Sequence, residues 1–219
     1  MAQGMKGLFI TFEGAEGSGK STQAQMACRY LKEQNKPVVH IREPGGVTIS
    51  EDIRNILLDV KNKRMANETE VLLYMAARAQ LVAERIQPEL QKGMVVMCDR
   101  YLDSTLAYQG HGNGVDMEII QAIGRFATCG IVPDLTLLFD IDAREGLKRI
   151  SRQHDRIESR ALDYHQRVRQ GYLEMAKAEP QRFRVISASG EKHAIQKQVR
   201  QHIDRLLEDQ HGRDQSASG

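Results

Sequence analysis

The feature that most constrains this chain is a glycine-rich run near its start, Gly14-Ala15-Glu16-Gly17-Ser18-Gly19-Lys20-Ser21. It matches the pattern G-x-x-x-x-G-K-[ST], directly follows the apolar stretch Leu8 to Phe12, and precedes a predicted helix from Thr22. Glycines let successive backbone N–H groups turn toward phosphate oxygens, and the following helix adds its positive N-terminus. An ordinary glycine-rich turn is the alternative, but such a turn does not need a strand before it and a helix after it. The run therefore predicts a strand, a phosphate-binding loop and a helix, in that order.

The pattern gives the residues of this loop separate tasks. Lys20 is expected to reach the β- and γ-phosphates of ATP, and Ser21 to offer its hydroxyl to Mg²⁺. Nucleotide contacts are predicted along the whole loop, at Gly14, Ala15, Glu16, Gly17, Ser18, Gly19, Lys20, Ser21 and Thr22. The base-reading N-K-x-D of many GTPases is absent, because Asn62-Lys63-Arg64-Met65 lacks the aspartate. A GTPase switch is therefore disfavoured, while the phosphate acceptor stays open.

Short apolar runs alternate with longer segments of helical periodicity, which is the order of an α/β protein. Two long helices are predicted, over Glu68 to Gln91 and over Glu158 to Ala178. Strands that are almost continuously apolar are typical of a parallel sheet with helices on both faces. We predict a three-layer α/β/α P-loop NTPase fold with about five parallel strands, at Leu8 to Phe12, Val38 to Ile41, Met94 to Cys98, Leu135 to Ile141 and Phe183 to Ile186.

Composition indicates the extent of the domain, its expected partners and its cellular compartment. The 219 residues are 41% hydrophobic and carry a formal charge of only +2, which gives no reason to expect a nucleic-acid or membrane surface. We expect one P-loop kinase domain over residues 1–208 and a disordered tail over 209–219. The three cysteines, Cys28, Cys98 and Cys129, have no metal-ligand spacing and are expected to be buried thiols, which favours a cytoplasmic protein.

A second group of polar residues follows the third predicted strand, at Asp99 and Arg100. The carboxyl ends of parallel strands share one edge of the sheet, so this pair is expected to face the phosphate loop. Asp99 has the chemistry to hold a metal shell or the acceptor, and Arg100 to clamp a phosphate with paired N–H donors. A strand-end ion pair at the surface is the alternative.

Several motifs together resemble those of the thymidylate kinase family, and the resemblance runs from Phe9 to about Leu207. They are Phe12-Glu13-Gly14, Arg42-Glu43-Pro44-Gly45-Gly46, Leu72-Leu73-Tyr74-Met75-Ala76-Ala77-Arg78, Asp99-Arg100-Tyr101, Ser104-Thr105, Ala107-Tyr108-Gln109-Gly110 and Asp155-Arg156-Ile157-Glu158. The resemblance implies an enzyme that transfers the γ-phosphate of ATP to dTMP with Mg²⁺, giving dTDP for the dTTP pathway. It also implies a homodimer formed through long helices.

The same resemblance implies an acceptor site. Tyr74 would stack on thymine and Arg78 would bond its carbonyl edge, in keeping with two residues four apart on one helix face. Tyr108 would lie against the sugar and leave no room for a 2′-hydroxyl, and Glu16 would accept the 3′-hydroxyl. The full predicted substrate set is Glu16, Glu43, Arg54, Tyr74, Arg78, Arg100, Ser104, Thr105, Tyr108 and Gln109, with Lys20, Asp99 and Arg100 also assigned to catalysis and Ser21 and Asp99 to the metal. For Tyr74 and Tyr108 core packing is the alternative, and for Arg78 a solvated salt bridge.

The segment Arg149-Ile150-Ser151-Arg152-Gln153-His154-Asp155-Arg156 is rich in arginine and lies between the fourth strand and a long helix. Phosphoryl transfer needs cations that close over the phosphates, so we predict a lid over about residues 149–157. Because Gly17 occupies the loop position that is basic in some thymidylate kinases, the chain resembles the bacterial type with the arginine in the lid. Arg152 or Arg149 is then the catalytic arginine and Arg156 a phosphate contact. A solvated helix end with i,i+4 ion pairs is the alternative.

Two other functions share the phosphate loop. The first is a kinase for another nucleoside monophosphate. The second is a P-loop ATPase that acts as a switch on nucleic acid or protein, which the near-neutral charge disfavours.

Overall fold

Five apolar segments form one parallel sheet, as predicted. The computed structural model describes residues 7–216, with side chains through Gln210. The strands are β1 (Leu8–Gly14), β2 (Val38–Arg42), β3 (Val95–Asp99), β4 (Leu135–Asp140) and β5 (Phe183–Ser187). Their order is β2-β3-β1-β4-β5, and every pair is parallel. Each residue of β1 and β3 is buried, which is what a sheet covered on both faces requires.

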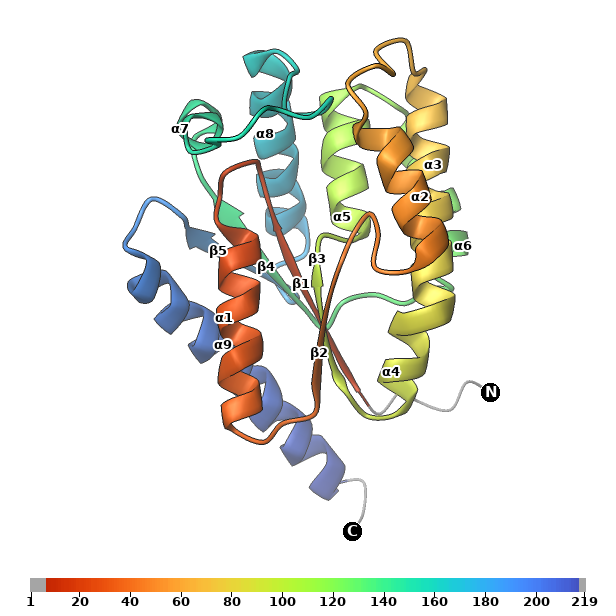
Figure 1. The fold of residues 1–219 in the computed structure, drawn as a ribbon. Coiled ribbons are helices and arrows are strands. Elements are labelled where there is room, and N and C mark those ends of the chain that lie inside the picture. The colour runs from red at the N-terminus through yellow and green to blue at the C-terminus, as the bar shows by residue number, and fades with distance from the viewer. Residues whose placement is uncertain (1–6, 217–219) are drawn as a thin grey trace.

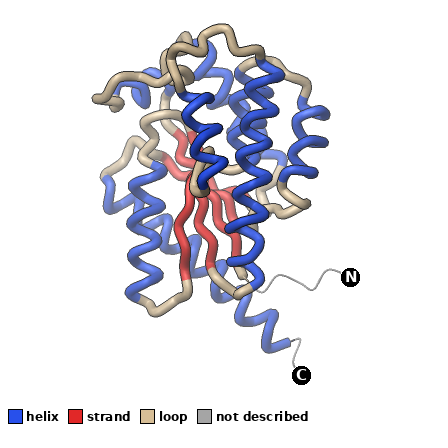
Figure 2. The backbone as a smooth tube through the Cα atoms, turned by 45° about the vertical axis from the view of Figure 1, so that its right-hand side comes forward, coloured by secondary structure: helices blue, strands red, loops and turns tan. Residues whose placement is uncertain are grey.

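Helices cover both faces of this sheet (Figures 1 and 2). On one face α1 (Lys20–Glu33) and α9 (Lys192–Ser216) pack side by side over alternate residues of β1, such as Ile10 and Phe12. On the other face Phe9 and Val96 pack against the helical segments that follow β2. The helices on this second face and at the sheet's carboxyl edge are α2 (Thr48–Leu58), α3 (Asn67–Leu81), η1 (Val82–Ile86), α4 (Gln87–Gln91), α5 (Leu102–Thr105), η2 (Leu106–Gly112), α6 (Met117–Ala127), α7 (Ala143–Lys148) and α8 (Leu162–Ala178). The three-layer α/β/α architecture is confirmed.

The strand register aligns the functional loops. Phe12 of β1 and Arg42 of β2 both lie opposite Asp99 of β3. The phosphate loop after β1, the segment after β2 and the Asp99-Arg100 pair therefore meet at the carboxyl edge of the sheet, as predicted.

The helix boundaries differ from the predicted ones in three places. The helix expected from Thr22 begins two residues earlier, at Lys20. The segment predicted as one helix over Glu68 to Gln91 is helical throughout but contains the π-helical turn η1; Pro88 lies in the first turn of α4, where proline is tolerated. The helix expected from Glu158 begins at Leu162, because Asp155 accepts bonds from the backbone N–H groups of residues 157 and 158 and holds a turn there.

Two further expectations need correction. Helix α9 continues to Ser216, so residues 209–216 are helical where the sequence predicted a disordered tail, and 217–219 lie outside the described residues. No proline interrupts this stretch, and its single glycine costs a helix only about 1 kcal/mol. Of the three free cysteines Cys28 and Cys98 are buried, but Cys129 is exposed because it lies in the loop after α6. Within residues 7–216 no helix has the length and apolar character needed to cross a membrane.

Candidate active site

The phosphate loop joins β1 to α1 in a backbone shape that its glycines make possible. Gly17 and Gly19 have φ angles of +67° and +80°, the left-handed region that favours glycine. At Gly17 a side chain is also excluded by space, since an added Cβ would lie 1.9 Å from the carbonyl oxygen of Gly146. A basic side chain therefore has no room at position 17, in agreement with the lid-arginine type inferred from the sequence.

Lys20 is buried at the start of α1, and its Nζ lies 3.4 Å from the carbonyl oxygen of Ala15. Such a long hydrogen bond is weak, so the ammonium group is available for a phosphate. Glu16, Asp99 and Glu13 favour its charged form, but burial and the charge of Arg100 lower the pKa of Lys20. A bound triphosphate would supply the missing negative charge.

Ser21 and Asp99 form a pair with the chemistry to hold a divalent cation. The Ser21 hydroxyl donates to Asp99 Oδ2, while Asp99 Oδ1 is buried without a hydrogen-bond partner in the described structure. Within the described residues, no group of three or more His, Cys, Asp or Glu side chains is placed so that it could hold a metal ion. A serine hydroxyl, a carboxylate and phosphate oxygens are hard oxygen ligands of the kind that Mg²⁺ prefers, so the pair fits magnesium held jointly with a nucleotide.

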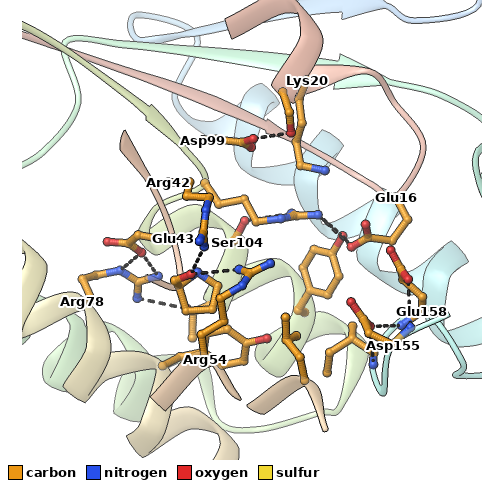
Figure 3. Close-up of a pocket in the computed structure, with 18 of the residues that line it drawn as sticks. Glu16, Lys20, Arg42, Glu43, Arg54, Arg78, Asp99, Ser104, Asp155 and Glu158 are labelled. Atoms are coloured by element: carbon orange, nitrogen blue, oxygen red, sulfur yellow. Dashed lines mark hydrogen bonds and ion pairs between the residues drawn. The ribbon is translucent and has the colours of Figure 1, made fainter. Parts of the chain in front are cut away.

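A cavity of about 210 Å³ opens beside this pair. It extends from the phosphate loop to residues that follow β2 and β3, and to residues within the helices α3 and η2 (Figure 3). The predicted site residues that line it are Glu16, Lys20, Ser21, Glu43, Arg54, Tyr74, Arg78, Asp99, Arg100, Ser104, Thr105, Tyr108, Gln109 and Arg152. The structure thus brings the predicted phosphate and acceptor residues to one cavity.

Arg100 lines the cavity and links the phosphate loop to η2. Its Nη2 donates to Glu16 Oε1 at 2.8 Å and to the Tyr108 hydroxyl at 3.0 Å, and its guanidinium lies 4.8 Å from the centre of the Tyr108 ring. Burial opposes ionisation of Glu16, but Arg100, Lys20 and the Tyr108 hydroxyl outweigh it and lower the pKa of Glu16 to about 2. Glu16 is therefore a carboxylate that only accepts hydrogen bonds, which suits a substrate hydroxyl.

Arg78 closes the opposite end of the cavity, where both it and Glu43 are almost fully buried. Its guanidinium donates to Glu43 Oε2 at 2.7 Å, to Thr105 Oγ1 at 3.0 Å and to the Tyr101 carbonyl at 2.9 Å. Burial raises the pKa of Glu43 even though Arg78 opposes the shift. The alternative of a solvated salt bridge at Arg78 is wrong, because this ion pair is inside the protein.

The remaining acceptor residues lie between these two ends. Arg54 donates to the carbonyl oxygen of Pro44 at 2.9 Å, and the half-buried ring of Tyr74 faces the cavity from α3. Ser104 accepts from Arg100 at 3.1 Å and donates to the buried carboxyl of Glu13 at 2.6 Å. Their positions suit contacts to a mononucleotide.

The arginine-rich segment sends its guanidinium groups in different directions. Arg152 reaches the cavity and forms two bonds with Glu158, at 2.7 and 2.6 Å. Arg149 does not line the cavity, since it binds Glu145 and the carbonyl oxygen of Ala188. Arg156, which was expected to contact a phosphate, does not line the cavity, and its Nη1 lies 2.6 Å from Glu70 Oε2.

Several cavity residues were not assigned by the sequence analysis. Arg42, Asp155 and Glu158 lay inside quoted motifs, which was the available signal, whereas Leu58 had none. Glu13 was missed as a support for Ser104. Burial, helped by the charge of Asp103, raises the pKa of Glu13 to about 7. An acidic residue in a mostly apolar strand was the available signal.

Known proteins resemble this chain in sequence and in fold. The sequence model of the family described as thymidylate kinase matches residues 12–199. The thymidylate kinase of Symbiobacterium thermophilum is 45% identical over 201 residues, covering 91% of this chain and 94% of its own, and that of Carboxydothermus hydrogenoformans is 50% identical over 184 residues, covering 83% and 89%. A crystal structure of thymidylate kinase from Ehrlichia chaffeensis superposes with a TM-score of 0.75 at 33% identity, covering 90% of this chain and 98% of that one. On these grounds the chain belongs to the thymidylate kinase family.

Proposed function

We propose that this protein transfers the γ-phosphate of ATP to dTMP with Mg²⁺, giving dTDP for the synthesis of dTTP. The observation that carries the proposal is the single cavity lined by the phosphate loop at one end and by Arg78, Thr105 and Gln109 at the other. A donor phosphate held by the loop and a pyrimidine held at Arg78 would place the acceptor phosphate between them. In-line transfer then needs positioning and charge stabilisation, with no covalent enzyme intermediate.

The donor end binds the triphosphate through the loop backbone and Lys20. Ser21 and Asp99 would hold Mg²⁺, which neutralises charge on the transferred group when it is bound. Arg100 and Arg54 provide guanidinium groups for the acceptor phosphate, and both line the cavity. Binding the phosphate at Arg100 competes with its present ion pair to Glu16, which frees that carboxylate for the sugar 3′-hydroxyl.

The base end selects thymine and deoxyribose by shape and hydrogen bonding. Tyr74 offers a ring for stacking and Arg78 a donor for a base carbonyl. Tyr108 is fixed by bonds to Glu16 and Arg100 on either side of its hydroxyl, so its ring cannot move away from a ribose 2′-hydroxyl without breaking them. This rigidity supports exclusion of ribonucleotides.

Residues 149–157 act as the lid, and we propose Arg152 as its catalytic arginine. Arg152 lines the cavity and is largely exposed, so exchange of Glu158 for a phosphate has little packing to disturb. Arg149 would need to leave both Glu145 and Ala188 to do the same.

We also propose that the protein is a homodimer that packs through α2, α3 and α6. These helices lie side by side, and each carries exposed apolar side chains, of which Phe126 is 85% exposed. A twofold interface brings the same face of two copies together, so an exposed apolar face suits it; the family resemblance also implies a homodimer. Light scattering should give twice the chain mass of 24.7 kDa, and Phe126→Lys should lower it toward the monomer; a monomeric parent protein would contradict this.

The three free cysteines suit a reducing compartment, so we propose that the enzyme works in the cytoplasm. We further propose that residues 7–216, including the whole of α9, form a single domain, with no nucleic acid among its partners.

The direct test is ADP release with ATP and each of dTMP, dUMP, UMP, CMP, AMP and GMP. We expect dTMP to be preferred and the reaction to stop when EDTA removes Mg²⁺. Preference for another monophosphate would support the rival kinase, and ADP release stimulated only by a polymer would support the ATPase switch.

A further inference from the structure

Glu70 is a completely buried carboxylate on α3 that does not line the cavity. Its Oε2 pairs with two arginines, Arg156 at 2.6 Å and Arg160 at 2.7 Å. Its Oε1 accepts from Gln109 Nε2 at 2.8 Å and from Asn113 Nδ2 at 3.1 Å. A buried carboxylate is costly unless it is paired and hydrogen-bonded, and here both oxygens are satisfied.

Of these partners Gln109 alone reaches the cavity. A side-chain amide has a donating and an accepting end, and a carboxylate paired with two cations can only accept. Glu70 therefore forces the NH₂ group of Gln109 toward itself. The amide oxygen is left for the cavity, where it would accept a hydrogen bond from a ligand.

We propose that Glu70 is a positioning residue for base recognition, because it fixes the Gln109 amide with its oxygen toward the base. A thymine ring has an N–H between two carbonyl groups, so it can donate to Gln109 while a carbonyl accepts from Arg78. Cytosine has no hydrogen on the corresponding nitrogen and would place an acceptor against the amide oxygen. Without Glu70 the amide can rotate by half a turn and offer its NH₂ group to cytosine instead.

The variant Glu70→Gln tests this, since glutamine can either donate or accept toward Gln109. We expect the dTMP-to-dCMP ratio of kcat/KM to fall by about threefold to tenfold, the effect of one hydrogen bond. Arg160→Met is the matched control. It removes an ion pair from Oε2 and leaves the Gln109 bond to Oε1, so stability should fall while the ratio stays within about twofold.

Because Glu70→Gln leaves Arg156 and Arg160 without their carboxylate, a variant with balanced charge is also needed. Glu70→Gln combined with Arg160→Met removes one negative and one positive group, so the net charge of the cluster is unchanged. Gln109→Leu supplies the expected limit: it should lower the ratio as well, and adding Glu70→Gln to it should lower the ratio no further.

The proposal would be overturned if kcat/KM fell equally for dTMP and dCMP in Glu70→Gln and in the balanced variant, because a purely structural role lowers both values alike. A similar fall of the ratio in Arg160→Met would overturn it too. The proposal would be supported if Glu70→Gln lowers the dTMP-to-dCMP ratio of kcat/KM in the parent protein but causes no further fall when it is added to Gln109→Leu.

Discussion

Replacing Arg78 with methionine should destabilise the whole fold as well as the base site. The guanidinium and the Glu43 carboxylate are 2% and 3% exposed and 2.7 Å apart, and Glu43 Oε1 already lacks a partner in the described structure. Breaking a buried pair from one side costs about 3–5 kcal/mol, because it leaves an uncompensated charge. For a chain of this size that corresponds to a fall in Tm of roughly 6–20 °C. Arg78→Met combined with Glu43→Gln removes both charges and should be more stable than Arg78→Met alone.

Denaturant unfolding of the parent, the two single variants and the double variant measures this coupling. The loss in Arg78→Met should also depend on pH. Burial raises the pKa of Glu43 above its ordinary value of 4.5, and removal of Arg78 takes away the group that opposes the shift. The protonated carboxyl needs no counterion, so the loss should be small near pH 4.5 and should grow as the pH rises. The prediction would be wrong if the two single variants changed the free energy of unfolding additively at every pH. It would also be wrong if the loss of stability in Arg78→Met grew as the pH fell.

Three further predictions concern phosphate chemistry. Lys20→Ala should keep the circular dichroism spectrum and lose most single-turnover transfer, because the fold makes little use of the ammonium; near-parental transfer would count against the phosphate loop. Gly17→Arg should lower stability by at least about 1–2 kcal/mol in thermal unfolding, since the left-handed backbone and the nearby carbonyl of Gly146 leave no room for a side chain. An unchanged Tm would show that the loop does not have this backbone shape. Arg152→Ala should lower kcat far more than it raises the KM for dTMP, while Arg149→Ala should change kcat little; the reverse order would move the lid arginine to position 149.

The sheet could be predicted because the apolar runs are local and the phosphate loop has a fixed pattern. The strands, their shared edge and the meeting of Ser21 with Asp99 follow from that alone. Long-range ion pairs could not be predicted, because a carboxylate such as Glu70 binds whichever cations the fold brings near it. Its partners Arg156 and Arg160 lie about ninety positions away, Arg156 in the predicted lid and Arg160 in the segment predicted as the following helix. The direction of Arg149 was open for the same reason, since a long guanidinium side chain has several partners of similar energy.

We propose that one cavity passes a phosphate from ATP to dTMP and keeps water from accepting it. The most direct measurement follows ATP labelled in the γ-phosphate and separates the products formed with dTMP, with UMP and with no acceptor. With dTMP, we expect the label in dTDP to equal the amount of ADP released. With UMP we expect far less transfer, and without an acceptor we expect inorganic phosphate to be released slowly. Label that appears mainly as inorganic phosphate whichever acceptor is present would contradict it.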